Sequence, residues 1–178
     1  MKNLIILSVI CILCATNAFC IENTLVIESD STWLISTNQF EGWQNLDFDD
    51  SAWIQATSPN TVHGGGWATS YQIAEGIKVN SMWSEGDDYG VYFRKSFIIE
   101  SCSIESAILY SNSDDDHKVY VNNILVATDM DGLGGPILTT DIKDYLKHGK
   151  NVIAVYGQDT YGYSKDFHIY SIINFSNV

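Results

Sequence analysis

The sequence predicts an all-β protein whose strands form an antiparallel β-sandwich. Short runs of β-branched and aromatic residues recur about every ten residues and are bounded by Gly, Asn, Asp and Ser, while sustained helical periodicity is scarce. The chain has 178 residues, which suits one domain and is too short for a catalytic barrel of roughly 250 residues. Its 46% hydrophobic fraction and only 2 prolines indicate a folded core.

The same runs locate the individual elements. Strands are predicted, in chain order, at residues 25–28, 91–99, 106–111, 118–121, 124–127, 151–156 and 167–175. Asn122 and Asn123 predict a two-residue hairpin turn between two of these strands, because Asn tolerates the positive φ that such turns require. Residues 140–145 predict a short helical connector capped by Thr140 or Asp141. Segments 57–90, 129–136 and 157–166 are predicted to be irregular, and long loops in compact domains often carry function.

Residues 1–20 have the three-part pattern of a secretory signal peptide. Lys2 is followed by an apolar run over residues 4–13 and then by small and polar residues. This run is shorter than the ~20 apolar residues of a membrane-spanning helix. We therefore expect residues 1–18 to be a signal peptide cleaved after Ala18, or alternatively after Cys20. Residues 19–178 are expected to form one domain that is secreted and not inserted in a membrane.

The position of signal-peptide cleavage determines which cysteines remain in the mature chain and whether two of them can form a disulfide. Cleavage after Ala18 leaves Cys20 and Cys102, which in an oxidising compartment can form a disulfide that ties the N-terminal strand to a loop. Such a closure contributes about 2–4 kcal/mol. Cleavage after Cys20 instead leaves Cys102 as a lone buried thiol.

The charge of the chain excludes one class of partner. Lys and Arg total 9 against 22 Asp and Glu, which gives a formal net charge of −13 at pH 7. A chain this acidic repels phosphate backbones and anionic lipid surfaces, so no nucleic-acid partner is expected. Solubility accounts for an acidic surface, and carboxylate-rich loops that hold calcium are the alternative.

Several segments occur in the order found in one known family. They are WQNLDFDDSAW at 43–53, YFRKSF at 92–97, AILYS at 107–111 followed by an acidic turn, VYVNN at 119–123 and NVIAV at 151–155. Over residues 32–175 the chain resembles the galactose-binding-like jelly-roll domain, the sugar-binding N-terminal module of family 2 glycoside hydrolases and of related β-galactosidases and rhamnosidases. It departs from the usual VYVNG at Asn123.

The resemblance implies a jelly-roll sandwich whose loops at one end bind carbohydrate. In those enzymes a catalytic barrel follows the module, and the chemistry lies in that barrel, so we expect no enzyme activity here. The histidines support this expectation, because their spacing fits neither a metal site nor a catalytic triad. Surface or hydrogen-bonded structural roles are expected for His63, His117, His148 and His168.

The motif residues also have a structural interpretation. Phe48 and Trp53 are expected to pack around a turn in which Asp49 accepts hydrogen bonds from backbone amides. In the strand at 92–97, alternation places Arg94 on one face, away from Phe93. A partner for Arg94 is expected among residues 114–116.

Sugar recognition needs aromatic faces that stack on the ring and carboxylates or amides that take its hydroxyls. Loop residues with these properties form the predicted ligand set: Trp67, Tyr71, Trp83, Asp87, Asp159, Tyr161 and Tyr163. In the alternative interpretation the Trp residues plug the end of the sandwich and the Tyr residues pack on its rim, and Trp83 is the residue for which burial is most expected.

The acidic turn Asp114, Asp115 and Asp116 is the candidate calcium site, because a hard cation needs six to eight oxygen ligands. A solvated turn is the alternative. The leading hypothesis is therefore a secreted, non-catalytic, lectin-like module that binds a carbohydrate or glycoprotein, with calcium as a possible structural ion. The other hypothesis is a structural or protein-interaction domain of the same fold that does not bind sugar.

Overall fold

The computed structural model describes residues 24–61, 69–86, 88–100, 103–162 and 164–176. Its elements, in chain order, are β1 (Thr24–Glu28), β2 (Leu34–Ser36), β3 (Ile54–Gln55), β4 (Ser70–Ala74), β5 (Ile77–Asn80), β6 (Gly90–Ile99), β7 (Ser103–Asp114), β8 (Asp116–Val121), β9 (Ile124–Asp129), β10 (Leu138–Asp141), the 3-10 helix η1 (Lys143–Tyr145), β11 (Gly149–Gln158) and β12 (Asp166–Ser176). A four-stranded sheet has the order β1-β12-β7-β10, and a six-stranded sheet has the order β3-β2-β6-β11-β8-β9. The strands pair antiparallel throughout, which confirms the predicted all-β sandwich.

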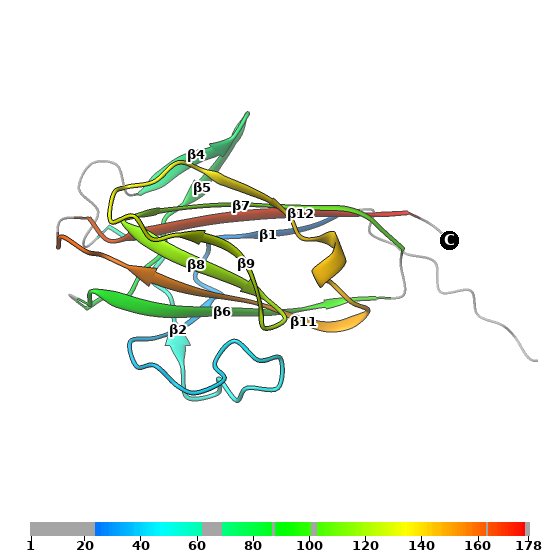
Figure 1. The fold of residues 1–178 in the computed structure, drawn as a ribbon, viewed down its shortest axis with the longest axis horizontal. Coiled ribbons are helices and arrows are strands. Elements are labelled where there is room, and N and C mark those ends of the chain that lie inside the picture. The colour runs from blue at the N-terminus through cyan, green and yellow to red at the C-terminus, as the bar shows by residue number, and fades with distance from the viewer. Residues whose placement is uncertain (1–23, 62–68, 87, 101–102, 163, 177–178) are drawn as a thin grey trace, which may run out of the picture.

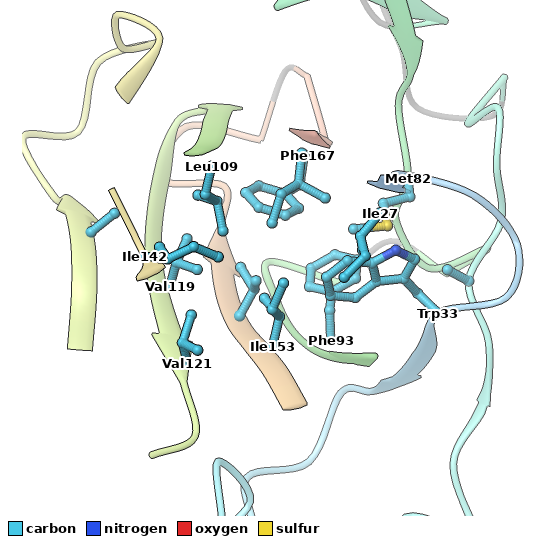
Figure 2. Packing of buried hydrophobic residues seen from close by; sticks show 14 of the residues in the cluster. Ile27, Trp33, Met82, Phe93, Leu109, Val119, Val121, Ile142, Ile153 and Phe167 are labelled. Atoms are coloured by element: carbon cyan, nitrogen blue, oxygen red, sulfur yellow. The ribbon is translucent and has the colours of Figure 1, made fainter. Parts of the chain in front are cut away.

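The main core lies between these two sheets (Figure 1). Phe167 and Leu109 of the four-stranded sheet face Phe93, Val119 and Ile153 of the six-stranded sheet (Figure 2). All of these side chains are fully buried. Burial of a side chain of this size contributes about 1.5–3 kcal/mol, so the inward alternate positions of the long strands hold the sandwich together.

The strands predicted from the sequence are all present, and each is longer by one to three residues at one or both ends. Asn122 and Asn123 have φ angles of 49° and 73°, which confirms the predicted hairpin turn between β8 and β9. The predicted helical connector is reduced to η1, because Thr140 and Asp141 continue β10 instead. The Asp141 carboxylate still accepts the Lys143 backbone N–H at 3.0 Å, as a residue at the start of a helical turn does.

The prediction that residues 57–90 are irregular is wrong over part of that range. β4 and β5 form a hairpin there, with Gly76 at a φ of 71° in the turn. The hairpin packs across the outer face of the four-stranded sheet, where Ile73 and Val79 contact Tyr170 of β12. The alternation of apolar residues that forms this hairpin was obscured by the surrounding Gly, Ser and Trp residues. A third layer therefore covers part of the sandwich (Figure 1).

The outer face of the six-stranded sheet is covered by the segment from Trp43 to Trp53. Phe48 and Trp53 pack edge to face at 5.6 Å between ring centroids, and Asp49 accepts the Ser51 backbone N–H at 3.0 Å, as predicted. Arg94 does not pair with residues 114–116. Its Nε donates to Asp50 Oδ2 at 2.8 Å, because Arg94 points to this outer face while residues 114–116 lie at the end of the sandwich.

In the described part of the chain, no helix has the length and apolar character needed to cross a membrane. Residues 1–18, Cys20 and Cys102 lie outside the described residues, so the signal peptide and the disulfide stay predictions.

Candidate functional site

The candidate site lies on the outer face of the four-stranded sheet, at the end where β7 stops and β12 begins. The register places Asp114 opposite Asp166 and Asn112 opposite His168. Directly paired residues share one face of an antiparallel sheet, and alternate residues along a strand do too, so all of these side chains lie on the same face. Phe167 points the other way, into the core. Alternation of the two strands therefore brings a polar cluster together outside the core.

The cluster lines a cavity of about 230 Å³. Tyr71 of β4 closes one side, and its ring lies 5.4 Å from the His168 ring. Gly134 and Gly135, from the loop between β9 and β10, close another side. The Asn112 side-chain amide donates to the Gly135 carbonyl at 2.7 Å and holds this loop in place. Three separate parts of the fold thus contribute walls to the cavity.

His168 is the most unusual group of the cavity. Its side chain is 1% exposed, yet within the described residues neither ring nitrogen has a hydrogen-bond partner. Nδ1 lies 3.4 Å from Asp166 Oδ1, too far for a good hydrogen bond. Burial lowers the pKa of His168 to about 4, so the ring is neutral near pH 7. A buried polar group without a partner costs about 1–3 kcal/mol, which indicates that this arrangement is not selected for stability.

The two carboxyl groups of the cavity hold their protons unusually strongly. Burial raises the pKa of Asp166 to about 7, and the charge of Asp114 adds to this shift. Burial also raises the pKa of Asp114 to about 6, with further contributions from Asp115 and Asp159. Perturbed carboxyls that gather in a cavity are characteristic of functional sites.

A second histidine nearby, His117, has hydrogen-bond partners for both ring nitrogens and serves as a comparison. His117 of β8 points into the core, where its Nδ1 lies 2.7 Å from Ser113 Oγ and its Nε2 lies 2.9 Å from Ser111 Oγ. Burial lowers the pKa of His117 to about 4. The expectation of a hydrogen-bonded structural histidine is confirmed for His117 and is wrong for His168.

The acidic turn beside the cavity organises loops. Asp115 Oδ2 accepts the backbone N–H groups of Thr160 and Tyr161 at 2.7 and 3.2 Å. Asp116 accepts the Gly132 backbone N–H at 2.7 Å and the Thr160 hydroxyl at 2.8 Å. These donors occupy oxygens that a calcium ion would need.

Among the residues that the structure describes, no group of three or more His, Cys, Asp or Glu side chains is placed to hold a metal ion. Calcium at Asp114, Asp115 and Asp116 therefore stays a prediction, and the geometry gives it no support.

The predicted ligand residues do not converge on one place. Trp83 is fully buried, with its ring 5.7 Å from Phe93 and its indole N–H donating to the Asp88 carbonyl, so its prediction as a sugar-stacking residue is wrong. Asp159 is also buried, and its Oδ1 accepts the backbone N–H groups of Tyr161 and Gly162. It shapes the loop and is not a surface ligand.

Two predicted tyrosines are placed where a ligand can reach them. Tyr71 lines the cavity, whereas Tyr161 is 59% exposed on the loop between β11 and β12. The predictions for Trp67, Asp87 and Tyr163 fall outside the described residues. Sequence reasoning missed Asn112, Asp166 and His168, although an Asp and a His at alternate positions of a strongly apolar strand were a signal for them.

A second cavity, of about 390 Å³, lies beside β2 and β3. Phe40 and Trp53 line it and pack on each other at 6.3 Å between ring centroids. Some of its polar side chains have partners within the fold: Ser36 Oγ donates to the Asn38 carbonyl at 3.1 Å, and Asp88 accepts the Ser84 hydroxyl at 2.9 Å.

Comparison with known proteins identifies the fold. No protein-family model matches the chain, and no curated protein matches it. Solved structures do match: a glycosyl hydrolase family 2 member from Bacteroides cellulosilyticus (TM-score 0.58, 20% identity) and a β-glycosidase from Bacteroides vulgatus (TM-score 0.56, 16% identity). A β-glucuronidase from glycoside hydrolase family 2 matches with a TM-score of 0.55 and 13% identity.

These matches cover 83%, 84% and 84% of this chain, but only 20%, 20% and 18% of the other chains. The chain thus spans about a fifth of the length of the enzymes that it resembles. Its fold is that of a β-sandwich domain of family 2 glycoside hydrolases, which confirms the resemblance inferred from the sequence motifs.

Proposed function

We propose that the chain is a secreted, non-catalytic, lectin-like module that binds carbohydrate in the cavity on β7 and β12. The observation that carries this proposal is His168, a buried ring that has no hydrogen-bond partner among the described residues and lies in a cavity that also holds Asp114 and Asp166. Hydroxyl groups of a sugar both donate and accept hydrogen bonds, so they satisfy a neutral imidazole and carboxyls at once. Tyr71 adds an aromatic wall, which sugar rings favour.

The arrangement of the carboxyls favours binding over hydrolysis. Glycosidases place two carboxyls on either side of the bond that they cleave. Asp114 and Asp166 instead lie side by side on neighbouring strands and point to the same face. A sugar above them meets both from one side.

Secretion of the module is proposed from the signal-peptide pattern of residues 1–18. The structural neighbours support a carbohydrate-related role, because they are named as glycoside hydrolases and glycosidases.

A glycan array tests the proposal. The secreted chain is applied at pH 7 in two separate runs, one with calcium and one with a chelator. We expect saturable binding that is lost in Tyr71→Ala and kept in Tyr161→Ala, which removes an exposed tyrosine that does not line the cavity. Both variants are first checked for an unchanged unfolding midpoint. A silent array from folded protein would contradict the proposal and favour a protein-interaction role. Loss of binding on chelation would support the calcium prediction.

A further inference from the structure

The cavity at His168 has a distinctive electrostatic character. Asp114 and Asp166 face each other across β7 and β12, and the described residues that line the cavity include no lysine or arginine. Elsewhere in the fold, buried charged groups lie next to a group of opposite charge. Arg94 Nε lies 2.8 Å from Asp50 Oδ2, and Lys165 Nζ lies 3.8 Å from Asp159 Oδ2. Asp114 and Asp166, by contrast, have no lysine or arginine beside them among the described residues that line the cavity.

His168 is an independent second observation that points to a ligand. Its ring is buried, is neutral near pH 7 and has no hydrogen-bond partner in the described part of the chain, so one ring nitrogen carries a free lone pair within the cavity wall. Tyr71 presents an aromatic ring beside it. A neutral imidazole acceptor, two carboxyls and an aromatic ring together are the groups that recognise an ammonium ion, which has three donors and no acceptor.

Size and geometry narrow the occupant further. The volume of about 230 Å³ lies below the range of about 300–1,000 Å³ of pockets for drug-sized ligands, so it suits one ring or the terminal residue of a longer glycan. Among the described residues, no three acidic, histidine or cysteine side chains are placed as metal ligands. The geometry therefore fits an organic cation better than a metal ion.

We infer that the cavity selects sugars that carry a free amine, with the ammonium group of a hexosamine held between Asp114, Asp166 and His168. This inference rests on the proposed function and names the class of its ligand. The net charge of −13 acts in the same direction, because it attracts cationic glycans and repels those that carry uronate or sulfate. Binding of the ammonium group relieves the repulsion between the two carboxylates, whereas a neutral hydroxyl at the same position does not.

The inference predicts a pH dependence with a defined sign. The groups that face the ammonium position are Asp114 from β7, Asp166 and His168 from β12, and Tyr71 from β4, with Asp115 and Asp159 acting on Asp114 from nearby. The pKa values of Asp114 and Asp166 are about 6 and about 7, so both carboxyls are protonated at pH 5 and mostly ionised at pH 7.5. His168, with a pKa of about 4, stays neutral across this range. Affinity for an amine should therefore fall as the pH is lowered from 7.5 to 5.

The test is an NMR titration of the secreted chain with three β-1,4-linked disaccharides: that of glucosamine, that of N-acetylglucosamine, and cellobiose. They differ in the group at carbon 2, which is an amine, an acetamide or a hydroxyl. The amine is more fully protonated at pH 5 than at pH 7.5, so a loss of affinity at pH 5 reports protonation of the carboxyls and not loss of charge on the sugar. We expect the glucosamine disaccharide to bind at least tenfold more tightly than the other two at pH 7.5, and to lose at least tenfold on going to pH 5. Asp166→Asn should remove most of this preference.

Asp144→Asn is the matched control, because it removes one exposed carboxylate from η1 and changes the net charge equally. It should keep the preference. Equal binding of all three disaccharides, or tighter binding of a neutral one, would overturn the inference and leave the proposed function standing. A preference that Asp166→Asn leaves intact would also overturn it. Absence of binding by all three, together with a silent glycan array, would count against the proposed function itself.

Discussion

The two outer faces of the sandwich both carry buried polar groups, and they differ in how these groups are satisfied. On the six-stranded sheet, Arg94 donates to Asp50 at 2.8 Å and to the backbone carbonyls of Trp43 and Asn45. On the four-stranded sheet, Asp114, Asp166 and His168 share a cavity to which the described residues supply neither a cation nor a hydrogen-bond partner for the imidazole. The first arrangement closes a loop over the sheet. The second keeps groups available, as a binding site does.

Two of the family motifs meet at the first face. WQNLDFDDSAW and YFRKSF meet there, because Arg94 of the second motif is held by Asp50 of the first. This contact gives both motifs a structural role, because it holds the segment from Trp43 to Trp53 on the sheet. The binding site is proposed on the other face, beside the acidic turn that follows the AILYS motif of β7.

The largest effect is expected from Arg94→Met. This substitution leaves Asp50 and the carbonyls of Trp43 and Asn45 without their donor, so it should lower the free energy of unfolding by about 3–5 kcal/mol in a urea titration. The control is Lys95→Met, which removes a more exposed ion pair with Asp30 at 3.6 Å and should cost less than about 1 kcal/mol. Equal losses in the two variants would show that the first face is not held together by Arg94.

The next largest effect on the free energy of unfolding is expected at Asp166, and it depends on pH. The folded state keeps a proton on Asp166 up to about pH 7, whereas the unfolded chain releases it near the ordinary value of 3.8. The contribution of this group to stability is therefore present below about pH 4 and is lost as the pH rises to about 7. The Asp166→Asn variant lacks this loss. The free energy of unfolding of the variant, relative to that of the unmodified chain, should therefore rise by on the order of 3 kcal/mol between pH 4 and pH 8.

The measurement is chemical unfolding of both proteins across this range of pH. His117 and His168 are present in both, and their lowered pKa values make stability rise from about pH 4 to 6.5 in each, so they cancel in the difference. A difference that does not change with pH would contradict the burial of an ionisable Asp166.

Substitution of the two buried histidines should change the stability of the fold by a smaller amount, and in opposite directions. His168→Leu removes a buried group without partners and should stabilise the fold by about 1–3 kcal/mol while abolishing ligand binding. His117→Leu removes the partner of Ser111 and Ser113 and should destabilise it by about the same amount. Thermal unfolding of the two variants checks the contrast. Destabilisation by His168→Leu would mean that the cavity is part of the structural framework.

The smallest effect on stability is expected for substitutions in the β8–β9 turn, which lies away from both faces. Asn123 has a φ of 73°, which Gly adopts more readily, so Asn123→Gly should raise stability by less than about 1 kcal/mol and leave binding unchanged. Asn122→Gly is the comparison, because its side chain accepts the Val152 backbone N–H and donates to the Tyr145 carbonyl. A net loss of stability is expected there, and a gain in both variants would show that those side-chain bonds contribute nothing.

The long strands and the β8–β9 hairpin were predictable from the sequence because they depend on local patterns. Runs such as that at β11 alternate or stay apolar over enough residues to identify a strand, and the positive φ of Asn122 and Asn123 follows from residue type. β4 and β5 were not predicted, because their short alternation is stabilised by packing on Tyr170, a contact distant in sequence. Tertiary packing decides such short strands.

The site was harder to predict than the fold. Tyr71 and Asp114 were identified as candidates, but only the register of β7 with β12 places Asp114 beside Asp166 and Asn112 beside His168. The sequence suggested that Trp83 and Asp159 were available to a ligand, whereas one fills the core and the other fixes a loop. Residue type indicates what a side chain can do, and only the pairing of distant strands shows which of them meet.

The most direct test of the account is a chemical-shift map of the protein during titration with the glucosamine disaccharide at pH 7.5. We predict that the largest shifts occur at Tyr71, Asn112 and the His168 ring, and that the Trp43–Trp53 face stays unchanged. Shifts that spare His168 and gather instead around Tyr161 or the cavity beside β2 and β3 would contradict the assignment of the binding site to the outer face of the four-stranded sheet.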